Sequence, residues 1–475
     1  MSSPTLAPGP LGKPSIRGDS RSNSQEDIRR TYSKHDSREV RTSKRIAESD
    51  KELELGLDGR EEDSSDTSDA DCSPDEAPDG GFEAWTVVLG GWCASFCGYG
   101  WINSIGTFQE YYQNGPLKEY SASEISWIPS LQIFFMSILG PVIGRIYDRY
   151  GLRVLVGVGS FMHVFGLMMA SLSTQYYQFL LSQGVCSAIG VAAVFVCALS
   201  TIPGWFTRRR GLAYGVLSTG SSLGGVVFPI MISRLIKTVG YGWAMRAAAF
   251  IILGLLVVAN LTLKTRLPPT ETKLSRELMA RPFREPSFVV LLAGLTLIPF
   301  GLYIPIDYMP VAAIAAGMSK DMSQNLVAFY NAASMVGRLS SGYLSDRLGK
   351  FNMFITACYI AGILILAMWI PGSSIAAVIA FSVLYGLSSG AYISLMAPLV
   401  AQISPPQEVG YRNGLTFLVS AVGGLTTSPI AGAIMNGPGG WVGLKAFAGA
   451  LLVAGTTGVL LCRVMRTGFK LLVAF

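Results

Sequence analysis

The sequence predicts an all-α membrane protein with twelve transmembrane helices in two six-helix, pseudo-symmetric halves, preceded by a disordered N-terminal tail. Three observations support this prediction. Half of the 475 residues are hydrophobic and only 14% are charged, and the mean hydropathy of +0.42 lies outside the range of soluble globular proteins. Apolar stretches of about twenty residues recur along the chain, and one charged motif occurs at matched positions in both halves.

The first 78 residues differ in composition from the rest of the chain. They are rich in Ser, Asp, Glu, Arg and Lys and contain few large apolar residues. Such a segment cannot bury enough apolar surface to offset the entropy lost on ordering, so we expect residues 1–78 to form a disordered cytoplasmic tail. The tail lacks the apolar core of a signal peptide, and the first span is therefore expected to act as an uncleaved targeting signal.

Twelve apolar stretches follow the tail, each long enough to cross about 30 Å of hydrocarbon. A polar cytoplasmic linker, 264–286, separates an N-terminal half, 79–263, from a C-terminal half, 287–475. The expected spans are 84–108, 123–147, 154–173, 178–200, 211–233, 243–263, 287–309, 323–345, 352–370, 375–397, 411–434 and 443–463.

Most basic residues outside the tail lie in the even-numbered connections between spans. The clearest group is Arg208–Arg210, which directly precedes the glycine-rich fifth span. By the positive-inside rule this asymmetry predicts that both termini lie in the cytosol. We expect a monomeric multi-pass protein in the lipid bilayer of the plasma membrane, with an internal membrane as the alternative.

Composition argues against several other classes. The net charge of +6 comes from basic residues at the ends of apolar segments, which does not favour nucleic-acid binding. The seven cysteines lack the spacing of metal ligands, and two histidines are too few for a membrane-bound metal oxidase. We therefore expect no metal and no cofactor. Since no nucleophile–base pair or phosphate-binding loop is evident, we do not expect an enzyme.

The chain contains an internal repeat. G-R-I-Y-D-R-Y-G-L-R, beginning at Gly144, follows the second span, and G-Y-L-S-D-R-L-G-K, beginning at Gly342, follows the eighth. In the fifth and eleventh spans, R-G-L-A-Y-G from Arg210 is echoed by N-G-L-T-F-L from Asn413. Two related halves of six helices around a central cavity are the architecture that such repeats indicate.

The doubled G-x-x-x-D-R-x-G motif resembles the diagnostic loop of the major facilitator superfamily. In each copy the aspartate can cap a helix N-terminus, and the arginine can meet a carboxylate or a helix C-terminus, so that charged contacts close one face of the bundle. We therefore predict that five residues of the two motifs control the conformational change: Asp148, Arg149, Arg153, Asp346 and Arg347.

Three further motifs resemble the monocarboxylate porter family, in a fungal-type member. They are P-D-G-G-F-E-A-W from Pro78, S-x-x-E-I-S-W-I from Ser121, and G-W-F-T-R-R-R-G-L-A-Y-G before and within the fifth span. The resemblance covers the chain from Pro78 onward and implies a secondary transporter that works by alternating access.

Arg338 is the leading candidate for substrate binding, because an arginine in the middle of a span suits bidentate hydrogen bonds to a carboxylate. The resemblance implies the same role, whereas a purely helix-joining arginine is the alternative. The family's first-span lysine corresponds here to Asn103 and its eighth-span aspartate to Ser334, so two groups credited with proton coupling are missing. The predicted substrate-binding set is Arg338, Asn103, Ser334, Tyr330 and Asn331.

Two ionisable residues are candidates for proton coupling. Asp307 lies near the end of the seventh span, where the flanking Pro305 and Pro310 favour an exposed position in a loop at the end of the helix. His163, in the third span, has an ordinary pKa suited to a proton relay. A hydrogen-bonded packing histidine is the more common role for such a residue.

We expect a transporter, secondary active or facilitative, that moves a small monocarboxylate-like organic anion. The alternatives are export of a secondary metabolite of a fungal biosynthetic pathway, transport of a neutral vitamin-like solute and, outside transport, a nutrient sensor that does not translocate. A standard drug/proton antiporter is disfavoured, because Leu180 stands where that group carries an arginine and Ser221 replaces a proline of its fifth-span motif.

Overall fold

The structure is a computed structural model. It describes residues 77–104, 108, 111–113, 115–266, 276–372 and 374–470, and every regular element among them is a helix. The expected tail lies outside the described residues up to residue 76, and so does the middle of the linker. All described residues belong to one unit, Cys72–Phe475.

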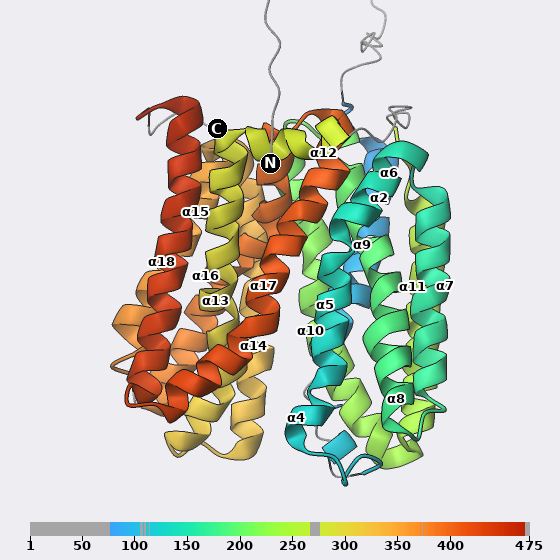
Figure 1. Cartoon of the computed structure of the whole chain (residues 1–475), viewed down its shortest axis with the longest axis vertical. Helices are drawn as coiled ribbons and strands as arrows, with labels where there is room; N and C mark the ends of the chain where they lie inside the picture. The colour runs from blue at the N-terminus through green and yellow to red at the C-terminus, as the bar shows by residue number, and fades with distance from the viewer. Residues whose placement is uncertain are drawn as a thin grey trace, which may run out of the picture. The chain divides into compact units, whose positions relative to one another are not determined.

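The N-terminal half follows the expected order of six long helical segments, several of which are built from shorter elements (Figure 1). These are α2 (Gly81–Ser95) with η1 (Phe96–Gly100); α4 (Ala122–Ile125) with α5 (Trp127–Ile138) and α6 (Gly140–Tyr150); α7 (Arg153–Ala170); α8 (Tyr176–Phe179) with η2 (Leu180–Ser187), α9 (Ala188–Thr201) and η3 (Ile202–Gly204); α10 (Arg210–Val239); and α11 (Tyr241–Thr262).

The C-terminal half begins with a short helix in the linker and continues with six long segments. These are α12 (Arg276–Arg284); α13 (Pro286–Ala315); α14 (Lys320–Leu348); α15 (Lys350–Leu364) with η4 (Ile365–Trp369); α16 (Ile375–Ile403); η5 (Pro406–Glu408) with α17 (Val409–Asn436); and α18 (Gly440–Thr467).

Ten of the described helical segments are long and apolar enough to cross a membrane. The other two expected spans correspond to α2 with η1, after which residues 105–107 are not described, and to α14, which carries several polar side chains. Large apolar residues are exposed on the outer helices, among them Phe161, Phe250 and Leu261. Such exposure suits contact with lipid, because no free energy is lost when apolar side chains face hydrocarbon.

The last glycine of each G-x-x-x-D-R-x-G motif ends a helix. Gly151 follows α6 with φ 80°, and Gly349 follows α14 with φ 93°. Glycine adopts this conformation without the steric cost that a β-carbon would add, so the motif stops the helix immediately after its charged residues.

The expectation of a loop at the end of the seventh span is wrong. α13 continues through Pro305 and Pro310 to Ala315, and Asp307 is exposed on the helix itself. Prolines are tolerated inside membrane helices, because neighbouring helices and local adjustments satisfy the carbonyls that lose a partner.

The main contacts between the halves are those of α10 with α14 and of α17 with α5 and α6. Figure 1 shows α17 beside α5, although the two are far apart in sequence. We call one end of the bundle the basic end; it contains Arg208–Arg210 and the loops that follow α6 and α14. α6 ends at this end and α12 lies there, at the top of Figure 1.

Candidate substrate site and gating contacts

Arg338 lies in α14, on the side that packs against α10, and only 3% of the residue is exposed. Its Nε donates to Ser334 Oγ, one turn earlier on the same helix, at 3.3 Å. Its Nη1 donates to the Ser218 carbonyl and to Ser221 Oγ, both on α10. The guanidinium therefore bridges the two halves of the molecule.

All three of these hydrogen-bond acceptors are neutral. Among the described residues, none of the ion pairs includes Arg338. A buried cation without a counter-charge is costly, because neutral acceptors replace only part of the solvation that water gave it. The arrangement can therefore bind an anion, which would supply the missing charge.

Two other predicted residues meet against α10. A β-carbon placed on Gly225 would lie 2.8 Å from Asn103 Nδ2 and 3.2 Å from Asn331 Oδ1. Gly225 lies one turn beyond Ser221, so both positions are on the same face of α10. The structure thus brings Asn103 and Asn331 together on the helix face that Arg338 contacts.

The remaining predicted residues lie on α14. Ser334 is fully buried and accepts the Arg338 hydrogen bond described above. Tyr330 faces α16: its hydroxyl accepts from Ser389 Oγ at 3.2 Å, and its ring stacks on Tyr385 with centroids 6.2 Å apart. Tyr330 therefore packs the C-terminal half together beside the arginine.

His163 is buried inside the N-terminal half. Its Nδ1 lies 2.9 Å from Ser187 Oγ, and its Nε2 lies 3.2 Å from the Cys97 carbonyl oxygen. Because a carbonyl only accepts, Nε2 carries a proton, and in the neutral ring Nδ1 then accepts from the serine hydroxyl. These contacts join α7 to η2 and η1, and both partners belong to the N-terminal half.

The two motif aspartates bind the starts of helices in the opposite half. Asp346 of α14 accepts from the backbone N–H groups of Gly211 and Leu212, at 2.7 and 2.8 Å, where α10 begins. Asp148 of α6 accepts from Gly410 and Tyr411, at 3.1 and 2.9 Å, where α17 begins. Each carboxylate satisfies helix N–H groups that have no partner within the helix.

Glycines allow the backbones to touch beside these caps. A β-carbon on Gly342 would lie 2.6 Å from the Gly211 carbonyl oxygen, and one on Gly144 would overlap the Gly410 carbonyl oxygen. Gly414 packs in the same way against Gly140. These contacts close the basic end between the halves.

The caps and glycines correct the register of the internal repeat. The alignment of Arg210 with Asn413 is wrong, because in the structure Gly211 and Gly410 occupy matching positions under the two aspartates. The same register pairs the later glycines of the two helices. The matched glycines are Gly211 with Gly410, Gly215 with Gly414, Gly224 with Gly423, and Gly225 with Gly424.

The motif arginines lie over aromatic rings. The guanidinium of Arg149 lies 5.0 Å from the centroid of the Tyr150 ring, and that of Arg347 lies 4.5 Å from that of Tyr343. Arg153 begins α7 and is exposed. Among the described residues, none of these three arginines takes part in an ion pair with a carboxylate. A carboxylate was one of the two partners expected of Arg149 and Arg347, and a helix C-terminus was the other.

Asp79 lies in the motif before the first span, and its contacts were not predicted from the sequence. Its Oδ1 accepts from the backbone N–H groups of Thr207, Arg208 and Arg209, at 2.6, 2.7 and 3.1 Å. The carboxylate therefore orders the arginine-rich turn that leads into α10, where Asp346 also binds. The spacing of the motif in the sequence carries no sign of this contact.

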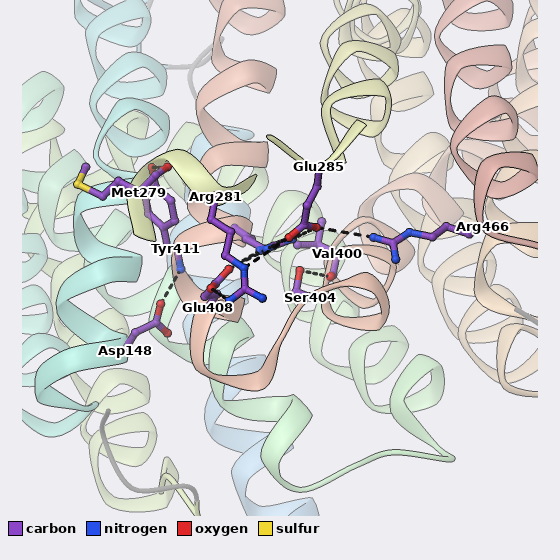
Figure 2. A network of polar contacts seen from close by, with 10 residues as sticks. Asp148, Met279, Arg281, Glu285, Val400, Ser404, Glu408, Tyr411 and Arg466 are labelled. Atoms are coloured by element: carbon purple, nitrogen blue, oxygen red, sulfur yellow. Dashed lines mark hydrogen bonds and ion pairs between the residues drawn. The ribbon is translucent and has the colours of Figure 1, made fainter. Parts of the chain in front are cut away.

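A network of charged residues at the basic end was also missed (Figure 2). Arg412 of α17 makes two hydrogen bonds to the Glu285 carboxylate, at 2.9 and 2.6 Å, and two to Glu408, at 2.9 and 2.8 Å. Arg281 of the linker helix α12 binds Glu408 at 3.0 Å, and Arg466 lies 3.7 Å from Glu285. These hydrogen bonds from Arg412 lower the pKa of the Glu285 carboxyl. Through these contacts the network holds Arg281 and Glu285 of the linker against the start of α17.

Replacing Arg412 by alanine should destabilise the protein by about 3 kcal/mol, because it leaves two adjacent carboxylates without the cation between them. The melting temperature in detergent measures this effect, and Arg284→Ala, which removes an exposed arginine nearby, is the control. The pKa of Glu285 is lowered on folding. Its contribution to the free energy of unfolding is therefore fully present above the ordinary pKa of a glutamate and is lost as the pH falls through its pKa in the folded protein.

The difference in melting temperature between wild type and Arg412→Ala should therefore stay constant from about pH 8 to about pH 5 and shrink below about pH 4. Equal melting temperatures for Arg412→Ala and Arg284→Ala would show that the network adds no stability.

Two groups of six long helical segments, joined by glycine contacts and reciprocal aspartate caps around a buried arginine, define a membrane transporter. The sequence profile of the Major Facilitator Superfamily matches residues 87–375, and that of the family Sugar (and other) transporter matches residues 302–464. The chain belongs to the major facilitator superfamily.

Its relatives are fungal transporters. The MFS transporter asaE of Aspergillus flavus is 55% identical over 404 residues, which is 85% of this chain and 91% of the relative. The Fujikurins efflux protein of Gibberella fujikuroi is 54% identical over 411 residues, with coverages of 86% and 88%. The Aspyridones efflux protein apdF of Emericella nidulans is 38% identical over 380 residues, with coverages of 80% and 77%. None of these three is named as a monocarboxylate porter.

Solved structures show the same fold. The fucose:proton symporter FucP of E. coli has a TM-score of 0.63 at 15% identity, covering 79% of this chain and 98% of that one. The human organic anion transporter MFSD10 has a TM-score of 0.61 at 14% identity, with coverages of 80% and 97%. As a member of this superfamily with relatives named as transporters, the chain is a multi-pass membrane transporter of small molecules.

Proposed function

We propose that this chain exports an organic anion, a secondary metabolite of a fungal biosynthetic pathway, by alternating access of its two halves. The observation that carries the anionic character is Arg338, which is buried between the halves with only neutral hydrogen-bond partners. Export is supported by relatives named for efflux of such metabolites. This is a transport role rather than catalysis, with the protein acting as a monomer.

We propose that the basic end faces the cytosol, with both termini on that side and the protein in the plasma membrane. The arginines before α10 support this orientation through the positive-inside rule. In that orientation, the aspartate caps and glycine contacts close the cytosolic side in the conformation described here. Opening toward the cytosol requires Asp148 and Asp346 to leave the helix starts that they bind.

The proposed anion site has no titratable partner at the positions that the monocarboxylate porter resemblance marks. Asn103 and Ser334 stand there, and neither side chain exchanges a proton in the physiological range. We therefore propose that binding of the anion at Arg338 does not require a bound proton beside it. Of the two candidates for proton coupling, Asp307 is exposed on α13, whereas His163 is held by two hydrogen bonds inside its half.

Transport should depend on the negative charge of the solute. In inside-out vesicles, we expect saturable uptake of labelled hippurate, an aromatic monocarboxylate, and no uptake of its neutral primary amide above that of vesicles without the protein. Smaller and larger monocarboxylates in a competition panel define the size of the site. A pH gradient should leave the hippurate rate unchanged.

The outcomes separate the alternatives. Equal transport of hippurate and its amide would favour a carrier of neutral solutes. Binding of the acids without flux would favour a sensor. If no acid in the panel is transported or bound, the proposal of an anion substrate fails.

A further inference from the structure

The hydrogen bonds of Arg338 place an acceptor from the opposite half where an anionic substrate would have to bind. We infer that Ser221, together with the Ser218 carbonyl, competes with the substrate for the Arg338 guanidinium when the basic end closes, and so drives release at the opposite face. This inference rests on the proposed function, because it takes Arg338 to be the group that binds the anion. It assigns Ser221 a positioning role.

The competing acceptors move with the closing contacts because both belong to one helix. α10 is continuous from Arg210 to Val239. Near its start, Gly211 touches Gly342 and receives the Asp346 cap. One turn later, a β-carbon on Gly215 would lie 2.7 Å from the Arg338 carbonyl oxygen. When the basic end opens, these contacts separate, and Ser218 and Ser221 leave the guanidinium with the helix that carries them.

Arg338 then exchanges partners in each direction. With α10 withdrawn, the guanidinium loses two acceptors in a buried setting, and an unpaired charged donor there is costly. A carboxylate that enters from the open basic end supplies the acceptors and the missing charge, so affinity is high on that side. When α10 returns, the Ser218 carbonyl and the Ser221 hydroxyl again accept hydrogen bonds from Arg338, and the affinity of the site for the anion falls. With the basic end facing the cytosol, this difference favours outward transport.

The related contact in the other half shows that packing alone does not require the arginine. The matched motif position of Arg338 is Gly140, and it packs directly against Gly414 and Phe417 of α17. The two halves therefore join at this level without any charged group. The guanidinium and its two acceptors are an addition on one side only, as expected of a single binding site.

The test compares Ser221→Ala with Ser222→Ala and Ser221→Thr. Ser222 is adjacent and buried, and its hydroxyl has no hydrogen-bond partner among the described residues, so it is a matched control. The half-saturation concentration of hippurate is measured from each face, in right-side-out and inside-out vesicles. We expect Ser221→Ala to lower this half-saturation concentration about tenfold at the outer face only. The reason is that the substitution removes a hydrogen bond to the charged Arg338 that competes with the anion.

The maximal export rate of Ser221→Ala should fall, because release of the anion becomes slower. Ser222→Ala and Ser221→Thr should behave as wild type. If Ser221→Ala matches Ser222→Ala at both faces, or changes both faces equally, the inference is overturned while the role of Arg338 stands. If Arg338→Ala still transports hippurate at the wild-type rate, or if wild type neither binds nor transports hippurate or the other acids of the panel, the proposed function fails and the inference falls with it.

Discussion

Replacing Arg338 by alanine should abolish transport of the anion, with a loss of about a hundredfold or more in the initial rate at low substrate concentration. The side chain is the buried cation on the contact face between α10 and α14, and none of its described partners carries charge. Arg338→Lys should recover only part of the rate, because an ammonium is a point charge without the planar fork that binds a carboxylate at two positions. Initial rates of hippurate uptake into inside-out vesicles measure both effects.

A loss of folding must be distinguished from a loss of binding. Arg338→Gln is the second variant, since it keeps most of the length and some hydrogen bonding but removes the charge. The rates are normalised to the amount of protein in the membrane, and the melting temperature in detergent reports stability. We expect Arg338→Gln to be as stable as wild type and inactive toward the acid. A variant that is stable, neutral at this position and fully active would show that Arg338 only joins the helices.

The fold could be predicted because a bilayer leaves few alternatives. A segment of about twenty apolar residues satisfies its backbone only as a helix, and the expected stretches match the long helical segments of the structure. The hydropathy of α14 is lowered by its polar residues, including Asn331 and Arg338 of the proposed site. The loop expected around Asp307 was wrong because the rule that proline ends helices comes from proteins in water.

The site could be predicted only in part. Arg338 is conspicuous in the sequence because a charge inside a span is expensive and therefore rare. Its partners on α10 are ordinary serines, and nothing in the local sequence states that Ser221 faces an arginine from the other half. The register of the repeat failed for a related reason. The sequences that begin at Arg210 and Asn413 are similar. The positions that match in space are instead those whose backbone N–H groups bind the two aspartates.

Replacing Gly144 by leucine should stop transport by preventing closure of the basic end. In the closed conformation even a β-carbon at this position overlaps the Gly410 carbonyl oxygen, which belongs to backbone and cannot move aside as a flexible side chain would. Each half can still fold, because the overlap arises only where α6 meets α17. The variant should therefore bind hippurate from the basic end at least as tightly as wild type, while its transport rate falls at least about tenfold.

Binding without transport is the combination that distinguishes blocked closure from a damaged site. Equilibrium dialysis with hippurate measures binding, and vesicle uptake measures transport. Gly254→Leu is the control, since a β-carbon there meets open space on α11. Gly342→Leu should act like Gly144→Leu, because Gly342 makes the matching contact with Gly211 in the other half. Normal transport by both variants would show that these glycine contacts need not form in the transport cycle. Loss of binding in both would show that the contacts maintain the site rather than close the basic end.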